Sequence, residues 1–346
     1  MSSMKDIVFG VENLNSSKRI GHLFEKAFTR ENLYIAYLDA IKGKRKKVKT
    51  FSFEKNLGTN LETLYNELHD GSYELSPYNE FTVYEPKERV IRAPHFRDLI
   101  VQHAIYRAIY TIFNRSFIDT SFACRKGGGT HKASEYTQKQ MRKYSGDMYY
   151  AKLDIKKFFY SIDRDVLRAL FERKIKDKRF VDLMVKFAQM DGNKGIPIGN
   201  LLSQLYALIY LNELDYFVKR DLKIKSYVRY VDDFVAIGLT LEEAKDFKEK
   251  CEKFVRNNLK LELSHWTIQK IKKSINFVGY RTWRSAKFVR KHSMYKFRKA
   301  LMSEDISSLG SCVGHAVGTA TMKYYRDMVQ MKKINLPKGV VKCLNM

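Results

Sequence analysis

The stretch Tyr227-Val-Arg-Tyr-Val-Asp-Asp-Phe-Val-Ala-Ile237 places two adjacent acids between two apolar runs that are typical of β-strands. Alternate side chains of a strand point to opposite faces, so one of Asp232 and Asp233 can point into a site while the other braces the turn. Neighbouring carboxylates repel each other unless a cation lies between them, and Mg²⁺ prefers oxygen ligands of this kind. The stretch therefore predicts either a metal-binding hairpin for phosphoryl transfer or an acidic turn on the surface.

A third acid, Asp154, ends the apolar run of Leu153-Asp154-Ile-Lys-Lys-Phe-Phe159. A site that holds two ions needs several carboxylates, because the ions stand about 3.5–4 Å apart and clamp the attacking and leaving oxygens. An aspartate at a strand–helix junction is also a frequent helix N-cap. Together with Asp232 and Asp233, however, Asp154 favours the metal site over the surface turn.

The composition indicates a polyanionic partner. The chain has 346 residues, of which 64 are Lys or Arg and 38 are Asp or Glu, and its formal net charge is +26. Basic side chains gain free energy by releasing counterions from nucleic-acid phosphates, and here they are spread along the chain, with a dense run at 42–49. The four cysteines lie far apart in the sequence, which predicts neither a disulfide framework nor a zinc site. We expect a cytoplasmic protein without a signal peptide or membrane span.

The alternation of strand-like and helical patterns predicts an α+β fold. Residues 1–75 read as a helical basic region, 80–90 as extended with a turn at 85–87, and 97–113 and 201–218 as long helices. The C-terminal part is again helical and basic. We therefore expect three regions, 1–75, 76–270 and 271–346, with the acids in the middle one.

These residues resemble motifs of a known family. Leu153-Asp154-Ile…Phe158-Phe159 and Tyr230-Val-Asp-Asp233 resemble motifs A and C of reverse transcriptases. The other blocks follow in the family's order over roughly residues 80 to 285: 84–91, 121–127 and Phe277-Val-Gly-Tyr280. The resemblance implies a right-hand polymerase with fingers and palm in 76–270, and a primer grip and helical thumb in 271–346.

The stretch Ile198-Gly199-x-x-x-Ser203-Gln204 differs from the Gln-Gly-x-x-x-Ser-Pro that most of the family carries. It resembles the enzymes of diversity-generating retroelements, which copy a template RNA and misincorporate at its adenines, and the stretches 101–104, 263–266 and 275–280 are similar to that group too. A glutamine at position 198 could hydrogen-bond the nucleotide, whereas isoleucine cannot. Losing such a bond costs about 0.5–1.5 kcal/mol, which is enough to weaken discrimination against mispairs. The alternative is that Ile198 packs beneath the loop.

The resemblance assigns roles to individual residues. Asp154, Asp232 and Asp233 are the expected catalytic and metal-binding acids, and the carbonyl of Ile155 is a further metal ligand. Six residues are expected to bind the nucleotide: Lys87, Arg89, Phe159 as a steric gate, Ile198, Gly199 and Gln204. Six are expected to contact primer or template: Tyr230, Phe277, Gly279, Tyr280, Lys291 and Arg298. Each basic thumb residue could equally lie on a solvated helix face.

The implied cofactor is a pair of Mg²⁺ ions, for which Mn²⁺ could substitute. The implied partners are template RNA, the RNA–DNA hybrid, deoxynucleoside triphosphates and a small basic accessory protein that assembles as a ring. His265 could protonate the leaving pyrophosphate or be a structural hydrogen-bonder, and its role stays open. Two alternative functions remain at this point: a bacterial antiviral defence reverse transcriptase and a non-catalytic RNA-binding relative.

Overall fold

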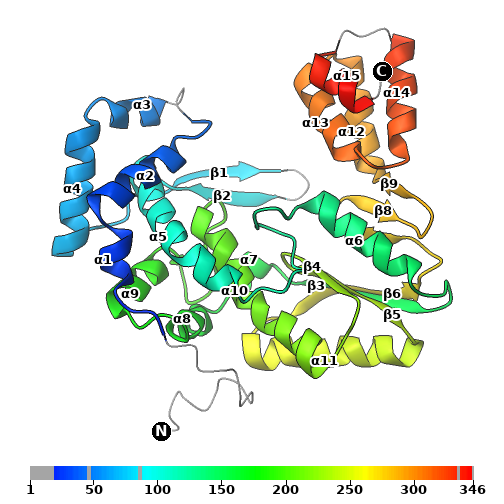
Figure 1. Cartoon of the computed structure of the whole chain (residues 1–346), viewed down its shortest axis with the longest axis horizontal. Coiled ribbons are helices and arrows are strands. Elements are labelled where there is room, and N and C mark those ends of the chain that lie inside the picture. The colour runs from blue at the N-terminus through cyan, green and yellow to red at the C-terminus, as the bar shows by residue number, and fades with distance from the viewer. Residues whose placement is uncertain (1–18, 45–47, 85–87, 333–335, 345–346) are drawn as a thin grey trace. The chain divides into compact units, whose positions relative to one another are not determined.

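The computed structural model describes residues 19–44, 48–84, 88–332 and 336–344, and Figure 1 shows its helices and strands. The chain forms two compact units. Unit 1 comprises Met1–Ile118, Ile155–Phe217 and Glu252–Ser264, and unit 2 comprises Asp119–Asp154, Val218–Cys251 and His265–Met346. Both contain helices and antiparallel strands, which confirms the α+β prediction.

Unit 1 is mainly helical. Its helices are α1 (Leu23–Ala27), α2 (Arg30–Ala40), α3 (Val48–Glu54), α4 (Leu57–Asp70), α5 (Phe96–Asn114), α7 (Phe158–Ser161), α8 (Arg164–Glu172), α9 (Lys178–Lys186) and α10 (Leu201–Tyr216). The long helices α5 and α10 lie side by side and confirm the helices predicted at 97–113 and 201–218. Since α10 is apolar nearly all round and buries most of its side chains, it forms the centre of this unit.

A two-stranded hairpin precedes α5. Strands β1 (Asn79–Val83) and β2 (Arg89–Ala93) pair antiparallel, with Val83 opposite Arg89. The extended segment expected over 80–90 is therefore two paired strands, because an isolated strand would leave its backbone groups unbonded. The expected turn at 85–87 lies outside the described residues.

Unit 2 is built around a four-stranded sheet in the order β4-β5-β3-β6. The strands are β3 (Tyr149–Ile155), β4 (Tyr227–Tyr230), β5 (Asp233–Leu239) and β6 (Leu263–Lys270). The helical elements are α6 (Thr130–Arg142), a π-helical turn η1 (Phe217–Asp221) and α11 (Leu241–Leu259), of which the part after Cys251 belongs to unit 1. Val235 and Ile237 pack on the α6 side with Met141, whereas Phe234 meets Phe247 of α11 edge to face. The alternation of strand side chains thus buries both faces of β5.

The C-terminal part of unit 2 has its own core. It consists of the sheet β7 (Ile275–Phe277), β8 (Tyr280–Thr282) and β9 (Lys287–Val289), followed by helices α12 (Lys291–Met302), α13 (Ile306–Ala316), α14 (Thr321–Lys332) and α15 (Lys338–Leu344). Phe297 stacks on Tyr325 at 3.6 Å between ring centres, inside a cluster that includes Leu309 and Val313. The helical C-terminal region predicted from the sequence is present. Within the described ranges, no helix is both long and apolar enough to cross a bilayer.

Candidate active site

The hairpin of the opening stretch turns through two residues, Val231 and Asp232, between β4 and β5. Val231 has φ 55°, a left-handed conformation that is a genuine outlier for a β-branched side chain. The guanidinium of Arg229, which is fully buried, donates a hydrogen bond of 2.9 Å from Nη1 to the carbonyl oxygen of Val231. Backbone strain of about 1–3 kcal/mol persists only where surrounding contacts hold it, and such strain concentrates at functional sites. The tip of the hairpin is therefore held in one shape by a buried cation.

The acids meet across the sheet. Asp154 on β3 pairs in register with Asp233 on β5, and Tyr230 on β4 pairs with Asp233 from the other side. Residues directly opposite each other in an antiparallel pair share a face, so Asp154, Asp233 and Tyr230 lie on the same side of the sheet. Sequence spacing placed Asp154 and Asp233 some eighty residues apart, and the strand register brings them together.

Asp233 has an unusual environment. Burial raises the pKa of its carboxyl group to about 7, and the charges of Asp154 and Asp232 act in the same direction, although Lys152 opposes them. The Lys152 Nζ lies 3.0 Å from Asp233 Oδ2. Asp233 Oδ1 is buried, and within the described part of the chain it has no hydrogen-bond partner. Lys152 thus offsets the negative charge of the carboxylate at Oδ2, while Oδ1 receives no hydrogen bond from the described residues.

These donors fit a hard divalent cation. Carboxylate oxygens are its preferred ligands, and a buried oxygen without a donor is one that a cation can satisfy. As the side chains are oriented here, no group of three or more His, Cys, Asp or Glu within the described ranges is arranged to hold a metal ion. A cation bound by Asp154, Asp232 and Asp233 therefore requires side-chain reorientation, for example of Asp233 away from Lys152.

The chain segment before the sheet supports the hairpin. Phe122 N donates to the carbonyl of Arg229 at 3.1 Å, and Arg229 N donates to the carbonyl of Thr120 at 3.0 Å. The block at 121–127, singled out in the sequence, therefore lies along β4. Sequence reasoning missed Arg229 and Lys152. The hydrogen bond of Arg229 to the Val231 carbonyl and the ion pair of Lys152 with Asp233 become visible only in the structure.

In unit 1, the loop 195–199 joins two other predicted elements through its backbone. Ile196 N donates to the carbonyl of Phe159 at 2.8 Å, and Arg92 N donates to the carbonyl of Ile198 at 2.7 Å. Phe159 and Ile198 are both partly exposed. The structure thus brings Phe159, Ile198 and β2 together, as a nucleotide-binding role would require.

Gly199 makes this arrangement possible. Its φ is +115°, and a Cβ at this position would lie 2.9 Å from both the carbonyl oxygen of Arg92 and Ile91 Cγ2. The sequence analysis includes Gly199 among the residues expected to bind the nucleotide. In the structure, the close approach is to the backbone of β2.

Two further residues position the start of α10. The side chain of Gln102, which is fully buried in α5, accepts a hydrogen bond of 3.0 Å from Leu201 N. Asn200, the N-cap residue, donates to Tyr78 Oη at 2.8 Å. Gln102 belongs to the block 101–104, which was noted in the sequence without a role. The exposed side chain of Gln204 follows one turn later.

The predicted phosphate-binding residues lie on the β1–β2 hairpin. Arg89 is exposed at the start of β2, whereas Lys87 lies outside the described residues. Arg92 bonds Glu80 through Nε at 2.6 Å and approaches Asp191 at 3.4 Å. Arg92 is therefore committed to internal ion pairs, and Arg89 is the more accessible cation.

Of the predicted primer-binding residues, two have buried aromatic side chains and one forms a backbone turn between them. Phe277 and Tyr280 are buried, and Tyr280 Oη lies 3.3 Å from His131 Nδ1 and donates 2.8 Å to the carbonyl of His315. Gly279 has φ +93° and packs against the ring of His315. Any contact of this turn with a primer would pass through its backbone, because the aromatic side chains belong to the core.

The two basic residues predicted on the C-terminal helices are both exposed, but they differ in their contacts. Lys291 is exposed at the start of α12, whereas Arg298 donates from Nε to Tyr324 Oη at 2.7 Å and lies over that ring. His265 is exposed on β6, and its role stays a prediction.

Comparison with known proteins identifies relatives over most of the chain. A family model described as "Reverse transcriptase (RNA-dependent DNA polymerase)" matches residues 84–282. The Group II intron-encoded protein LtrA of Lactococcus lactis subsp. cremoris is 25% identical, and the match covers 77% of this chain and 58% of LtrA. Protein YkfC of Escherichia coli (strain K12) is 26% identical over 70% of this chain and 74% of YkfC. The chain thus spans little more than half the length of LtrA.

Among solved structures, telomerase from Candida albicans in complex with a fragment of telomeric RNA aligns with a TM-score of 0.48 and 11% identity. That alignment covers 85% of this chain and 60% of the telomerase chain.

Proposed function

Because this chain belongs to the reverse transcriptase (RNA-dependent DNA polymerase) family, we propose that it is an RNA-directed DNA polymerase whose active site contains Asp154, Asp232 and Asp233. The observation that carries the proposal is the register of Asp154 opposite Asp233, with one buried oxygen of Asp233 lacking a donor within the described residues. Two Mg²⁺ ions, held by these acids and the carbonyl of Ile155, would activate the primer hydroxyl and stabilise the leaving oxygen.

The chain's own residues supply the rest of the proposed site. Arg229 fixes the hairpin so that Asp232 and Asp233 keep one backbone geometry, and Lys152 counters the charge of Asp233. Arg89 and Lys87 bind the triphosphate, and Phe159 excludes a ribose 2′-hydroxyl. Tyr230 and the turn at Gly279 hold the primer end. The net charge of +26 supports template RNA and the RNA–DNA hybrid as partners.

We further propose that the enzyme serves a diversity-generating retroelement and makes adenine-mutagenic cDNA in the cytoplasm. The support is the sequence Ile198-Gly199-x-x-x-Ser203-Gln204 and the partial exposure of Ile198 on a loop bonded to both Phe159 and β2. The ring-forming accessory protein belongs to the same proposal and rests on the sequence resemblance. Sequencing the cDNA made inside the host cell tests this subclass. Errors confined to template adenines support it, and errors spread over all four bases contradict it.

Replacing Ile198 with Gln is expected to lower misincorporation opposite adenine by about 2- to 10-fold, because a regained hydrogen bond to the nucleotide contributes about 0.5–1.5 kcal/mol to discrimination. Ile198→Val is the matched control, since it changes the volume without adding a polar group. The measurement is the error spectrum of cDNA copied from one RNA template. If Ile198→Gln leaves that spectrum unchanged, Ile198 does not set the fidelity.

A further inference from the structure

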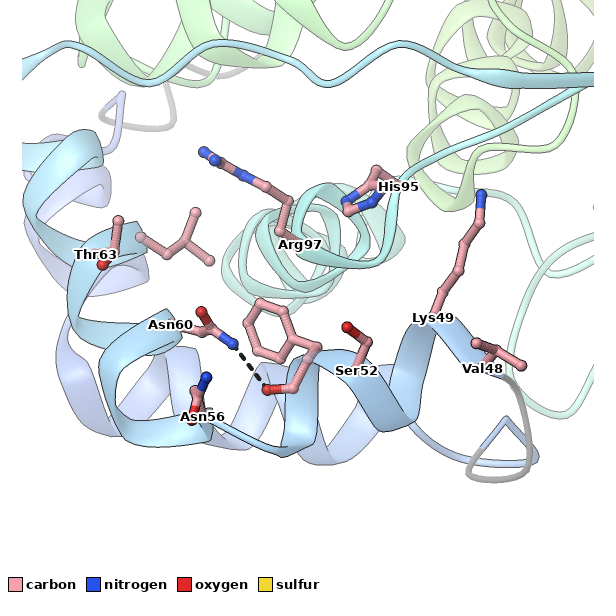
Figure 2. A pocket seen from close by; sticks show the side chains of 10 residues that line it. Val48, Lys49, Ser52, Asn56, Asn60, Thr63, His95 and Arg97 are labelled. Carbon is pink, nitrogen blue, oxygen red and sulfur yellow. Dashed lines mark hydrogen bonds between the residues drawn. The ribbon is translucent and has the colours of Figure 1, made fainter.

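A pocket in the N-terminal part of unit 1 contains none of the residues assigned to polymerisation. Its volume is about 580 Å³, within the range of small-molecule sites. It is lined by Val48, Lys49, Ser52, Phe53, Asn56, Asn60, Thr63, Leu64, His95 and Arg97. Figure 2 shows that these side chains come from α3 and α4 on one side and from the start of α5 on the other.

One part of the pocket is positive. The exposed Lys49 donates to the amide oxygen of Asn79, a neutral group that does not offset the charge of the lysine. Helix α5 begins at Phe96 without a side-chain cap from His95, and such a helix end favours an anion. Within the described residues, His95 Nδ1 is buried without a hydrogen-bond partner. These groups together suit a phosphate.

The two acids near this end of α5, Glu67 and Asp98, are engaged by neighbouring groups. Arg97 pairs with Glu67 through its terminal nitrogens, and its buried Nε lies 3.8 Å from Asp98 Oδ1. Asp98, in the first turn of α5, accepts hydrogen bonds from Tyr73 Oη at 2.6 Å and Ser76 N at 3.0 Å. No Asp or Glu is among the described residues that line the pocket.

The other part of the pocket suits a base. Asn60 Nδ2 donates to the carbonyl of Phe53 at 2.9 Å, which orients the amide while its oxygen can still accept a bond (Figure 2). Asn56 is exposed beside it, and the Phe53 ring is braced edge to face by Phe96 at 5.3 Å. Amides read base edges by donating and accepting hydrogen bonds, and aromatic rings stack on any base.

We propose that this pocket binds a nucleotide, with its phosphate at Lys49 and the start of α5 and its base against Phe53, Asn56 and Asn60. The nucleotide is either a free mononucleotide or one unit of an RNA strand, because both present the same phosphate and base. Binding here does not depend on the proposed polymerase activity.

The test measures binding to the full-length protein. Titration calorimetry uses 5′-AMP, 5′-CMP, 5′-GMP and 5′-UMP, and fluorescence anisotropy uses short labelled oligoadenylate and oligouridylate. Lys49→Ala removes the phosphate contact, and Ser52→Trp fills the pocket from an exposed position. Lys55→Ala is the matched control, since it removes the same charge just beyond α3 from a residue that does not line the pocket.

Lys49→Ala and Ser52→Trp are expected to lower the binding affinity for the mononucleotides, the oligonucleotides or both about tenfold, as loss of a charge-assisted bond predicts. Lys55→Ala is expected to lower the affinity less than about twofold. Weakened mononucleotide binding identifies a free nucleotide as the ligand, and weakened oligonucleotide binding alone identifies an RNA strand. Asp232→Ala should bind the probes at this pocket with unchanged affinity, which separates this inference from the polymerase proposal. If both pocket variants fold, by circular dichroism, and bind every probe like the wild-type protein, the inference is wrong.

Discussion

Replacing Asp154 with Asn is expected to reduce RNA-templated DNA synthesis on the order of 10³-fold while leaving the fold intact. Metal ions held by carboxylates contribute several kcal/mol to the transition state, and about 1.4 kcal/mol corresponds to each tenfold change in rate. The substitution keeps the shape of the side chain and removes a like charge that faces Asp233 across the sheet. The midpoint of thermal unfolding should therefore be no lower than that of the wild-type protein.

Asp147→Asn is the matched control for this prediction, because Asp147 is an exposed acid of the same unit that pairs with Lys270 and Lys272. Primer extension measures activity, and thermal unfolding with increasing MgCl₂ measures metal binding independently. Mg²⁺ should raise the unfolding temperature of the wild-type protein and of Asp147→Asn more than that of Asp154→Asn. If Asp154→Asn were as active as Asp147→Asn, Asp154 would not be part of the active site.

The second large effect is expected for Gly199→Ala. The new methyl group would lie 2.9 Å from the carbonyl oxygen of Arg92, on a backbone with φ +115°. Because the carbonyl belongs to β2, the loop must move, and the bond from Arg92 N to the Ile198 carbonyl is lost or lengthened. We expect a cost of about 1–3 kcal/mol in the free energy of unfolding. Displacement of the loop by about 1 Å can also lower the polymerisation rate about 10²-fold.

Gly192→Ala is the control that distinguishes a steric clash of the new methyl group from the strain of a positive φ. Gly192 also has a positive φ, of +74°, but a Cβ there meets no described atom within 4 Å. Urea unfolding and primer extension of both variants make the comparison. Gly192→Ala should keep nearly full activity, and an equal loss in the two variants would show that contact with β2 is unimportant.

The sequence predicts the hairpin that carries Asp232 and Asp233 well because its signals are local. Apolar alternation on both sides of Asp232 and Asp233 specifies two strands and a tight turn, and the structure has them. The long helices α5 and α10 are predicted for the same reason, since their apolar periodicity extends over many residues.

Features that depend on contacts between distant segments could not be predicted. The pairing of Lys152 with Asp233 follows from a register between strands far apart in the sequence. The capping of α10 by Gln102 joins two helices through a side chain whose role no local pattern reveals. The burial of Tyr280 against His131 and His315 likewise depends on tertiary packing. Short blocks identified the positions of Gln102 and Tyr280, but only the structure gives each a physical role.

The most direct test of the central claim is primer extension by the full-length protein on an RNA template annealed to a DNA primer, with deoxynucleoside triphosphates and Mg²⁺. The wild-type protein should extend the primer in a template-dependent manner, and Asp232→Ala should not. Absence of extension by the folded wild-type protein, or equal extension by Asp232→Ala, would contradict the assignment of this hairpin as the polymerase active site.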